Sequence, residues 1–253
     1  MKITFLGTGT SQGVPVIACE CEVCTSTDPK DNRLRSSVMI ESDGVVLVID
    51  SGPDFRYQML REKVKHLDAI LFTHEHKDHV AGLDDVRAFN FKQQKDMDIY
   101  ASKRVQDALI NEFRYAFATI KYPGVPLLNL IEIKNERFEV LGVRVVPIEV
   151  MHYKLPVYGF RIGDFTYITD AKTVSETERT KIKGTKVLVI NALQKDNHIS
   201  HFTLAEAIQF AKEIGAPKTY FTHISHRLGR HQDISKQLPD GIELAYDRFS
   251  FSL

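Results

Sequence analysis

The stretch Thr73-His74-Glu75-His76-Lys77-Asp78-His79 places three imidazoles and an aspartate within six residues. It follows an apolar run, residues 67–72, whose composition predicts a buried strand. An extended backbone directs His74 and His76 to the same side, because side chains alternate along a strand. Asp78 and His79 follow at the point where the chain is expected to turn into a helix. So many potential ligands at the end of one strand are hard to explain by packing, and they predict a metal site.

Three further potential ligands each follow a predicted strand, namely His152, Asp170 and His223. Taken singly, each could equally be a capping residue or a core residue. Strand ends in an α/β protein lie along one edge of a sheet, where sites are built. Since the heptapeptide alone cannot supply two divalent ions, we expect these three residues to complete its ligand set.

A second cluster contains all the cysteines of the chain, Cys19, Cys21 and Cys24. Thiolates at this spacing can converge on one tetrahedral zinc, which still needs a fourth ligand from elsewhere. The alternative is a set of buried free cysteines, but the flanking residues are polar. An odd number of closely spaced cysteines suits a metal site in a reducing compartment, so we expect a cytoplasmic protein.

The bulk composition sets limits on the function. The chain has 253 residues, of which 43% are hydrophobic, so it can form one large α/β domain or two small ones. Its 33 basic and 33 acidic residues argue against a protein that coats nucleic acid or anionic membrane, although a local basic pocket remains possible. We expect no signal peptide and no membrane-spanning segment.

The pattern of strands and helices predicts an α/β protein with two sheets packed face to face and helices outside. Each half is mostly β with interspersed helices, and a helix is expected at 55–65. Thr203 and Glu206 predict a capping box at the start of another helix. The last two elements are predicted to be a short helix, 231–238, and a closing strand, 242–251.

His74-x-His76-x-Asp78-His79, followed in order by His152, Asp170 and His223, resembles the metallo-β-lactamase superfamily. The cysteine cluster together with His226 is similar to the phosphodiesterases of the carbon–phosphorus lyase pathway, which open phosphoribosyl 1,2-cyclic phosphate. This resemblance implies a four-layer αββα sandwich. It also implies a single domain over residues 1–253, with a Cys-rich structural zinc insertion at about residues 17–30.

The resemblance further implies a ligand arrangement. One catalytic metal would be held by His74, His76 and His152. The other would be held by Asp78, His79 and His223, with Asp170 bridging the two metals. A structural zinc would be held by Cys19, Cys21, Cys24 and His226. Zn and Mn fit the catalytic ligands, as does Fe, and a homodimer is expected.

Several catalytic roles also follow from the resemblance. A metal-bridging hydroxide would be the nucleophile, and Asp50 would orient a ligand histidine. His201, just before a helix, is the candidate general acid, with His198 as its rival. The two remaining histidines, His66 and His231, are interpreted as surface residues.

Four functions are weighed. The first is a metal-dependent phosphodiesterase acting on a small, cyclic phosphodiester, because two divalent metals outweigh the charge of Asp78, Asp170 and the hydroxide and leave the site positive. The alternatives are an RNA 3′-processing endonuclease and a thioester hydrolase of the same superfamily. The last is a non-catalytic, zinc-stabilised binding module. Zero net charge and the absence of a long arm make a nucleic-acid partner less favoured than a small molecule.

Overall fold

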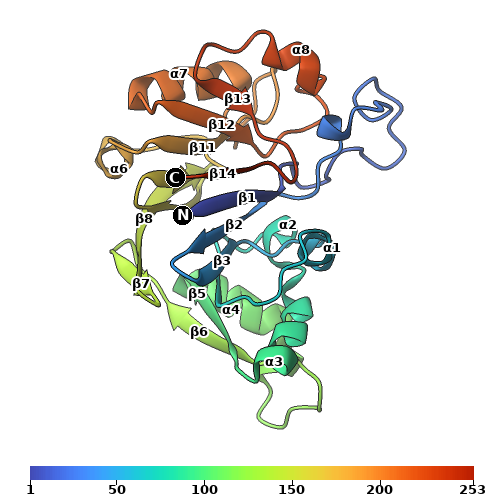
Figure 1. The fold of residues 1–253 in the computed structure, drawn as a ribbon, viewed down its shortest axis with the longest axis vertical. Helices are drawn as coiled ribbons and strands as arrows, with labels where there is room; N and C mark the ends of the chain where they lie inside the picture. Colours follow the sequence, from blue (N-terminus) through green and yellow to red (C-terminus); the bar gives the residue numbers. More distant parts are fainter.

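The computed structural model describes residues 1–253 as two seven-stranded sheets that face each other (Figure 1). The first sheet has the order β14-β1-β2-β3-β4-β5-β6. Its strands are β1 (Lys2–Gly7), β2 (Ser37–Ser42), β3 (Val45–Ile49), β4 (Ala69–Leu71), β5 (Met97–Ala101), β6 (Leu128–Glu132) and β14 (Ser250–Ser252). The second sheet has the order β13-β12-β11-β10-β9-β8-β7. Its strands are β7 (Phe138–Val140), β8 (Val143–His152), β9 (Leu155–Ile162), β10 (Phe165–Tyr167), β11 (Val187–Asn191), β12 (Lys218–Thr222) and β13 (Ile242–Leu244).

Helices form the two outer layers. The first sheet is accompanied by α1 (Phe55–Arg61), α2 (Lys77–Val80), α3 (Arg87–Gln93), α4 (Lys103–Glu112) and α5 (Arg114–Phe117). The second is accompanied by α6 (Glu176–Ile182), α7 (Leu204–Ile214) and α8 (His231–Ser235). The chain also contains two short 3₁₀ helices, Pro29–Asp31 and Leu83–Val86. None of the helices combines the length and the apolar character needed to cross a bilayer.

The four layers follow from strands that are apolar on both faces. In β3, Leu47 and Ile49 enter the core between the sheets, whereas Val46 and Val48 pack under the helices of the first sheet. β11 divides its side chains in the same way between the central core and a core under the helices of the second sheet. Because side chains alternate along a strand, each fully apolar strand requires cover on both sides. The predicted αββα sandwich is therefore confirmed.

The sheet topology explains where functional side chains gather. Strands β3 to β6 run parallel, and so do β10 to β13. The carboxyl ends of parallel strands meet at the same edge of a sheet. The backbone of Thr73 accepts a bond from the Tyr158 N–H at 3.0 Å, and that of Thr8 accepts one from the Ile224 N–H at 2.9 Å. Both bonds tie the first sheet to the second close to this edge.

Three predictions about local structure are wrong and one is confirmed. The closing strand, predicted at 242–251, is two strands: β13 pairs with β12 in the second sheet, and β14 pairs with β1 in the first. Helix α1 ends at Arg61, short of the predicted residue 65, and Lys63 beyond it is left-handed, with φ 55°. Helix α8 ends at Ser235, short of the predicted residue 238. The capping box of Thr203 and Glu206 is present as predicted.

Candidate metal centre

The heptapeptide folds as a strand end followed by one helical turn. β4 ends just before it, and α2 begins at Lys77, so Asp78 and His79 lie in the first turn of that helix. His74 Nε2 lies 3.0 Å from His76 Nδ1, and His79 Nε2 lies 3.1 Å from Asp78 Oδ2. The side chains of His74 and His79 are fully buried, whereas His76 is exposed at the mouth of the site.

Asp170 lies at the centre of the cluster, shortly after β10. Its Oδ2 atom is 3.2 Å from His79 Nε2 and 3.3 Å from His223 Nδ1. Its Oδ1 atom is 3.7 Å from His201 Nδ1. One buried carboxylate therefore contacts histidines contributed by both sheets.

All seven predicted catalytic ligands lie in this cluster. Three overlapping groups of ligand atoms lie within 4.8 Å of one another, namely His74/His79/Asp170, Asp78/His79/His223 and His152/Asp170/His201. His76 joins them through its ring, whose centroid is 4.5 Å from that of His74 and 5.2 Å from that of His152.

The donor atoms fit divalent metals. His79 Nε2, His201 Nδ1 and His223 Nδ1 are buried and have no hydrogen-bond partner in the protein. Burying a polar atom without a partner is costly, so such atoms call for a ligand. Imidazole nitrogens and carboxylate oxygens are suitable ligands for zinc and manganese.

Burial and neighbouring charges set the protonation of the cluster. Burial lowers the pKa of His74 well below its usual range and that of His201 to about 3. Burial alone would raise the pKa of Asp170, but the neighbouring His223 and His79 lower it well below its usual value. Burial alone would lower the pKa of His79, but the carboxylates around it raise this pKa well above its usual value. The neutral His74 and the ionised Asp170 are already in the forms that bind a cation, whereas His79 must lose a proton to do so.

Asp50 supports the heptapeptide from the end of β3. Its buried carboxylate accepts bonds from the Thr73 N–H at 2.9 Å and the Thr73 hydroxyl at 2.8 Å. The oxygen that accepts the Thr73 hydroxyl, Oδ2, is also 2.7 Å from His79 Nδ1, and this contact directs His79 Nε2 toward Asp170. Burial raises the pKa of Asp50. This is the geometry of a ligand-orienting carboxylate.

Three of the strand-end residues have a left-handed backbone, Asp50 (φ 64°), Asp170 (φ 56°) and His223 (φ 55°). Such conformations cost free energy in residues other than glycine, and they persist where the surrounding structure imposes them. All three side chains point into the same cluster, so the strain is concentrated at the site.

The other histidines are held by neighbours that the sequence did not single out. His152 Nδ1 donates to the Ser200 carbonyl at 2.9 Å, and His223 Nε2 lies 3.2 Å from the Thr10 hydroxyl. The Thr10 contact comes from the Gly-rich loop after β1. Nothing in the spacing of Thr10 or Ser200 signals this role, because both contacts depend on the tertiary fold.

The structure separates His201 from its rival. His201 is buried, and its ring centroid lies 4.6 Å from that of His152 and 5.0 Å from that of His223. His198 is only half-buried, and its Nδ1 accepts a bond from the Ser200 N–H at 3.3 Å. His201 is thus the histidine brought to Asp170, whereas His198 caps its own loop.

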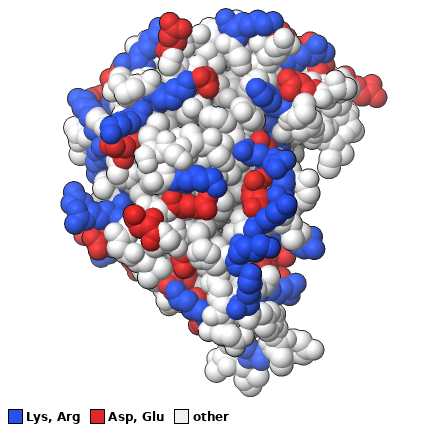
Figure 2. Space-filling view, viewed as in Figure 1, with Lys and Arg blue, Asp and Glu red and all other residues white.

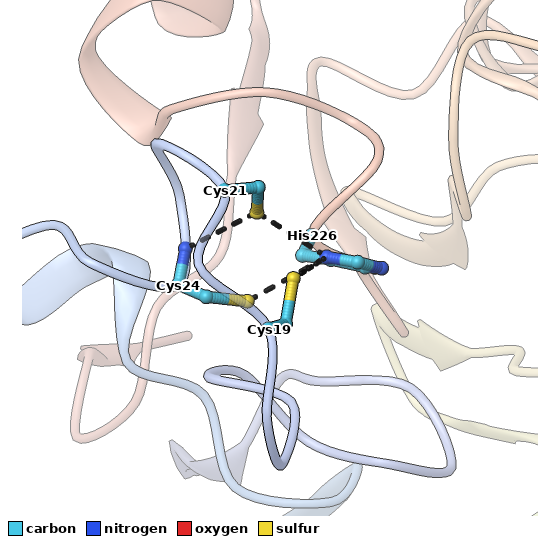
Figure 3. A group of neighbouring side chains, drawn as sticks. All are labelled: Cys19, Cys21, Cys24 and His226. Atoms are coloured by element: carbon cyan, nitrogen blue, oxygen red, sulfur yellow. Dashed lines mark hydrogen bonds between the residues drawn. The ribbon is translucent and has the colours of Figure 1, made fainter.

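The cysteine cluster closes around His226, which lies three residues after His223 (Figure 3). His226 Nδ1 is 3.3, 3.4 and 3.5 Å from the sulfur atoms of Cys19, Cys21 and Cys24. The Cys24 N–H bonds to Cys21 Sγ and lowers the pKa of Cys21 to about 6, whereas burial raises that of Cys24 to about 11. Three sulfurs and one imidazole nitrogen are a donor set for tetrahedral zinc.

One histidine assignment is wrong. His66 is exposed, as expected, but His231 is 8% exposed, and its Nδ1 lies 3.1 Å from Arg33 Nη2. The buried Arg33 also donates to the Thr8 hydroxyl at 2.8 Å and to the Ala245 carbonyl at 2.6 Å. His231 therefore belongs to a polar network that joins the start and the end of the chain.

The two-sheet fold and the carboxylate-centred histidine cluster define a protein of the metallo-β-lactamase fold. The chain belongs to the β-lactamase superfamily, since a family described as "Beta-lactamase superfamily domain" matches residues 46–224. The match spans all seven candidate catalytic ligands and leaves out the three cysteines and His226.

Similar proteins support this assignment. The crystal structure of a protein described as a new diphosphatase from the PhnP family has 39% identity and a TM-score of 0.93, and the match covers 99% of this chain and 96% of that one. An octanoyltransferase of Porphyromonas gingivalis is 40% identical over 250 residues, which are 98% of this chain and 50% of that protein. A ribonuclease Z of Staphylococcus epidermidis is 25% identical over 168 residues, which are 64% of this chain and 49% of that protein. The chain thus spans about half the length of the curated relatives it matches.

Replacing Asp50 with Asn tests the orienting contact. The amide keeps the size of the side chain but removes the charge that faces His79 Nδ1, so the affinity for catalytic metal is expected to fall about 10–100-fold. Competition with a chromophoric chelator measures this affinity. Ser51→Ala, at the neighbouring buried hydroxyl, serves as the control and should bind metal normally. Normal metal affinity in Asp50→Asn would show that the contact has no such role.

Replacing Cys21 with Ser tests whether the two clusters are coupled. His223 and His226 share one short segment, so loss of a thiolate is expected to lower both the melting temperature and the affinity for catalytic metal. The control is Ser175→Ala, which removes the N-cap of α6 at a cost of about 1 kcal/mol away from both clusters. If Cys21→Ser lowers thermal stability but leaves the catalytic metal affinity unchanged, the two clusters are independent.

Proposed function

We propose that the protein is a phosphodiesterase that uses two divalent metals to hydrolyse a small phosphodiester. The observation that carries the proposal is the position of Asp170, which lies within 3.3 Å of histidines from both halves of the cluster. A carboxylate in that place can bridge two ions. The seven candidate ligands would divide between the two ions as the superfamily resemblance implies.

Charge favours an anionic substrate. Two divalent ions carry four positive charges, and Asp78 and Asp170 contribute two negative charges. The ligand imidazoles add no charge, because they are neutral when they bind metal. The surplus positive charge attracts a phosphodiester more strongly than a neutral amide or thioester.

Metals bound at such a site lower the pKa of water toward about 7 and neutralise phosphate oxygens. The chain's own residues supply orientation and proton transfer. Asp50 fixes the ring of His79, and the Ser200 carbonyl fixes that of His152. His201 is the candidate general acid. Burial lowers its pKa to about 3, and the Asp170 carboxylate, 3.7 Å from its Nδ1, opposes that shift. A bound phosphate anion would also raise the pKa of His201, so that the imidazole could take up a proton and deliver it to the leaving oxygen.

The similar proteins support phosphorus-centred chemistry. The PhnP-family protein is described as a diphosphatase, and it aligns along nearly its whole length. The octanoyltransferase matches over only half of its length, so the octanoyl-transfer activity can reside in its other half. A small phosphodiester or diphosphate, including a cyclic phosphodiester, is therefore the substrate class we favour.

RNA 3′ processing is the second candidate, because the chain is similar to ribonuclease Z. Figure 2 shows both signs of charge interspersed over one face, with a run of basic side chains along its right-hand edge. Such a run could contact a nucleic-acid backbone. Cleavage of a labelled precursor tRNA, measured beside hydrolysis of bis(p-nitrophenyl) phosphate, distinguishes the two candidates.

Two further expectations concern the whole protein. Light scattering tests the expected homodimer, and the thiolate ligands suit the expected cytoplasmic location.

Asp170→Asn tests the bridging role. Loss of the central carboxylate is expected to lower bis(p-nitrophenyl) phosphate hydrolysis more than about 100-fold, since even residues that merely orient a ligand contribute 10–100-fold. Asp164→Asn, at a half-exposed carboxylate paired with Lys186, is the matched control and should remain active. Retained activity in metal-loaded Asp170→Asn protein would rule out the role.

His201→Ala tests the general acid. The loss is expected to be about 10²–10⁴-fold for a phosphodiester with a poor leaving group and much smaller for p-nitrophenolate, which leaves without a proton. His198→Ala is the control and should retain activity with both substrates. The assignment is reversed if His198→Ala shows the leaving-group dependence and His201→Ala does not.

A further inference from the structure

A recess of about 460 Å³ opens directly beside the metal cluster. It shares two residues, His76 and His152, with the candidate ligand set. Its other lining residues are Tyr153, Lys154, Leu155, Ile199 and Ser200. The two histidines are candidate metal ligands, and the Ser200 carbonyl orients His152. The apolar side chains of the recess have no part in either role.

Tyr153 forms one wall of the recess, and its backbone conformation is unusual. It occupies the tight turn between β8 and β9, and its φ of 56° lies in the left-handed region that favours glycine or asparagine. Its side chain is nevertheless an aromatic ring that is 52% exposed, so burial compensates little of the strain. A strained, exposed aromatic residue next to a metal ligand points to a binding role.

Ile199 lines the same recess from the loop that carries His201. It is 65% exposed. The two walls are tied together because His152, which precedes Tyr153, donates to the carbonyl of Ser200, which follows Ile199. The recess is therefore bounded by two apolar surfaces held in a fixed relation at the metal cluster.

Lys154 adds a positive charge at the rim. Its Nζ atom lies 5.3 Å from the centroid of the Tyr153 ring, within the range of a cation–π contact. This contact holds an ammonium group beside the ring, where it can attract the phosphate of a substrate whose aromatic part lies in the recess.

We propose that the recess binds a flat aromatic ring of the nucleobase type, carried by the phosphate ester that the metal cluster hydrolyses. This inference rests on the proposed function and narrows its substrate class. Aromatic side chains stack on bases irrespective of base identity, and apolar walls with one polar group at the rim are typical of small-ligand sites. A ribosyl phosphate without a base would leave the recess empty of ring contacts, so ring-bearing esters should bind more tightly.

Calorimetry on the metal-loaded protein tests the proposal directly, with adenosine 5′-monophosphate and ribose 5-phosphate as probes. Both probes carry the same phosphate and ribose, and only the first carries a base. We expect the adenosine compound to bind about tenfold more tightly. This preference should disappear in Tyr153→Gly, which removes the ring and relieves the strained backbone, so the melting temperature should not fall. Tyr153→Phe keeps the ring and should keep the preference.

Tyr122→Gly, at an exposed tyrosine outside the recess, is the matched control and should bind as the unaltered protein does. Equal affinity of the unaltered protein for the two probes would overturn the proposal, and so would an unchanged preference in Tyr153→Gly. The proposed function is tested independently, by hydrolysis of bis(p-nitrophenyl) phosphate. If the metal-loaded protein does not hydrolyse this compound, the proposed function is wrong, but the calorimetric comparison still decides whether the recess recognises a ring.

Discussion

The contact of the Asp170 carboxylate with His79 on one side and His223 on the other is the constraint on which the site depends. These histidines come from opposite sheets, and their ring nitrogens lie within 3.3 Å of one carboxylate oxygen. Bringing them together requires the two sheets to meet in one relative position. The apolar core between the sheets provides the driving force for that arrangement, and the cross-sheet backbone bonds near Thr73 and Ile224 fix it at the site.

The free-energy cost of the site is spread over the surrounding fold. Left-handed backbone at Asp50, Asp170 and His223, and imidazole nitrogens buried without partners, both oppose folding of the metal-free chain. Ligands that bind these nitrogens stabilise the folded state by mass action. The cysteine cluster adds a second anchor, because His226 holds the segment that also carries His223. Folding and metal binding are therefore expected to be coupled in this protein.

The sequence predicted those features that depend on local chemistry. The heptapeptide, the spacing of the cysteines and the Thr203 capping box each place their key atoms within a few residues, so the pattern carries the information. The two-sheet architecture was also predictable, because strands such as β3 and β11 are apolar on both faces.

Features that depend on long-range packing could not be predicted. The composition of residues 242–251 predicts one strand. Nothing in it indicates that the chain crosses from one sheet to the other within this segment. His231 gave no sign that Arg33, nearly two hundred residues earlier, would bury it. The conformation of Tyr153 was likewise hidden, because a turn sequence of Tyr and Lys does not indicate positive φ.

Metal content tests the central claim most directly. Protein purified without chelator should contain about three divalent ions per chain, two in the Asp170 cluster and one among the cysteines. Elemental analysis beside native mass spectrometry gives both the number and the identity of the ions. About three ions per chain, falling to about one in Asp170→Asn, is the predicted result. About one ion per chain in the unaltered protein, after incubation with excess zinc or manganese, would contradict a two-metal hydrolase and favour a zinc-stabilised binding module.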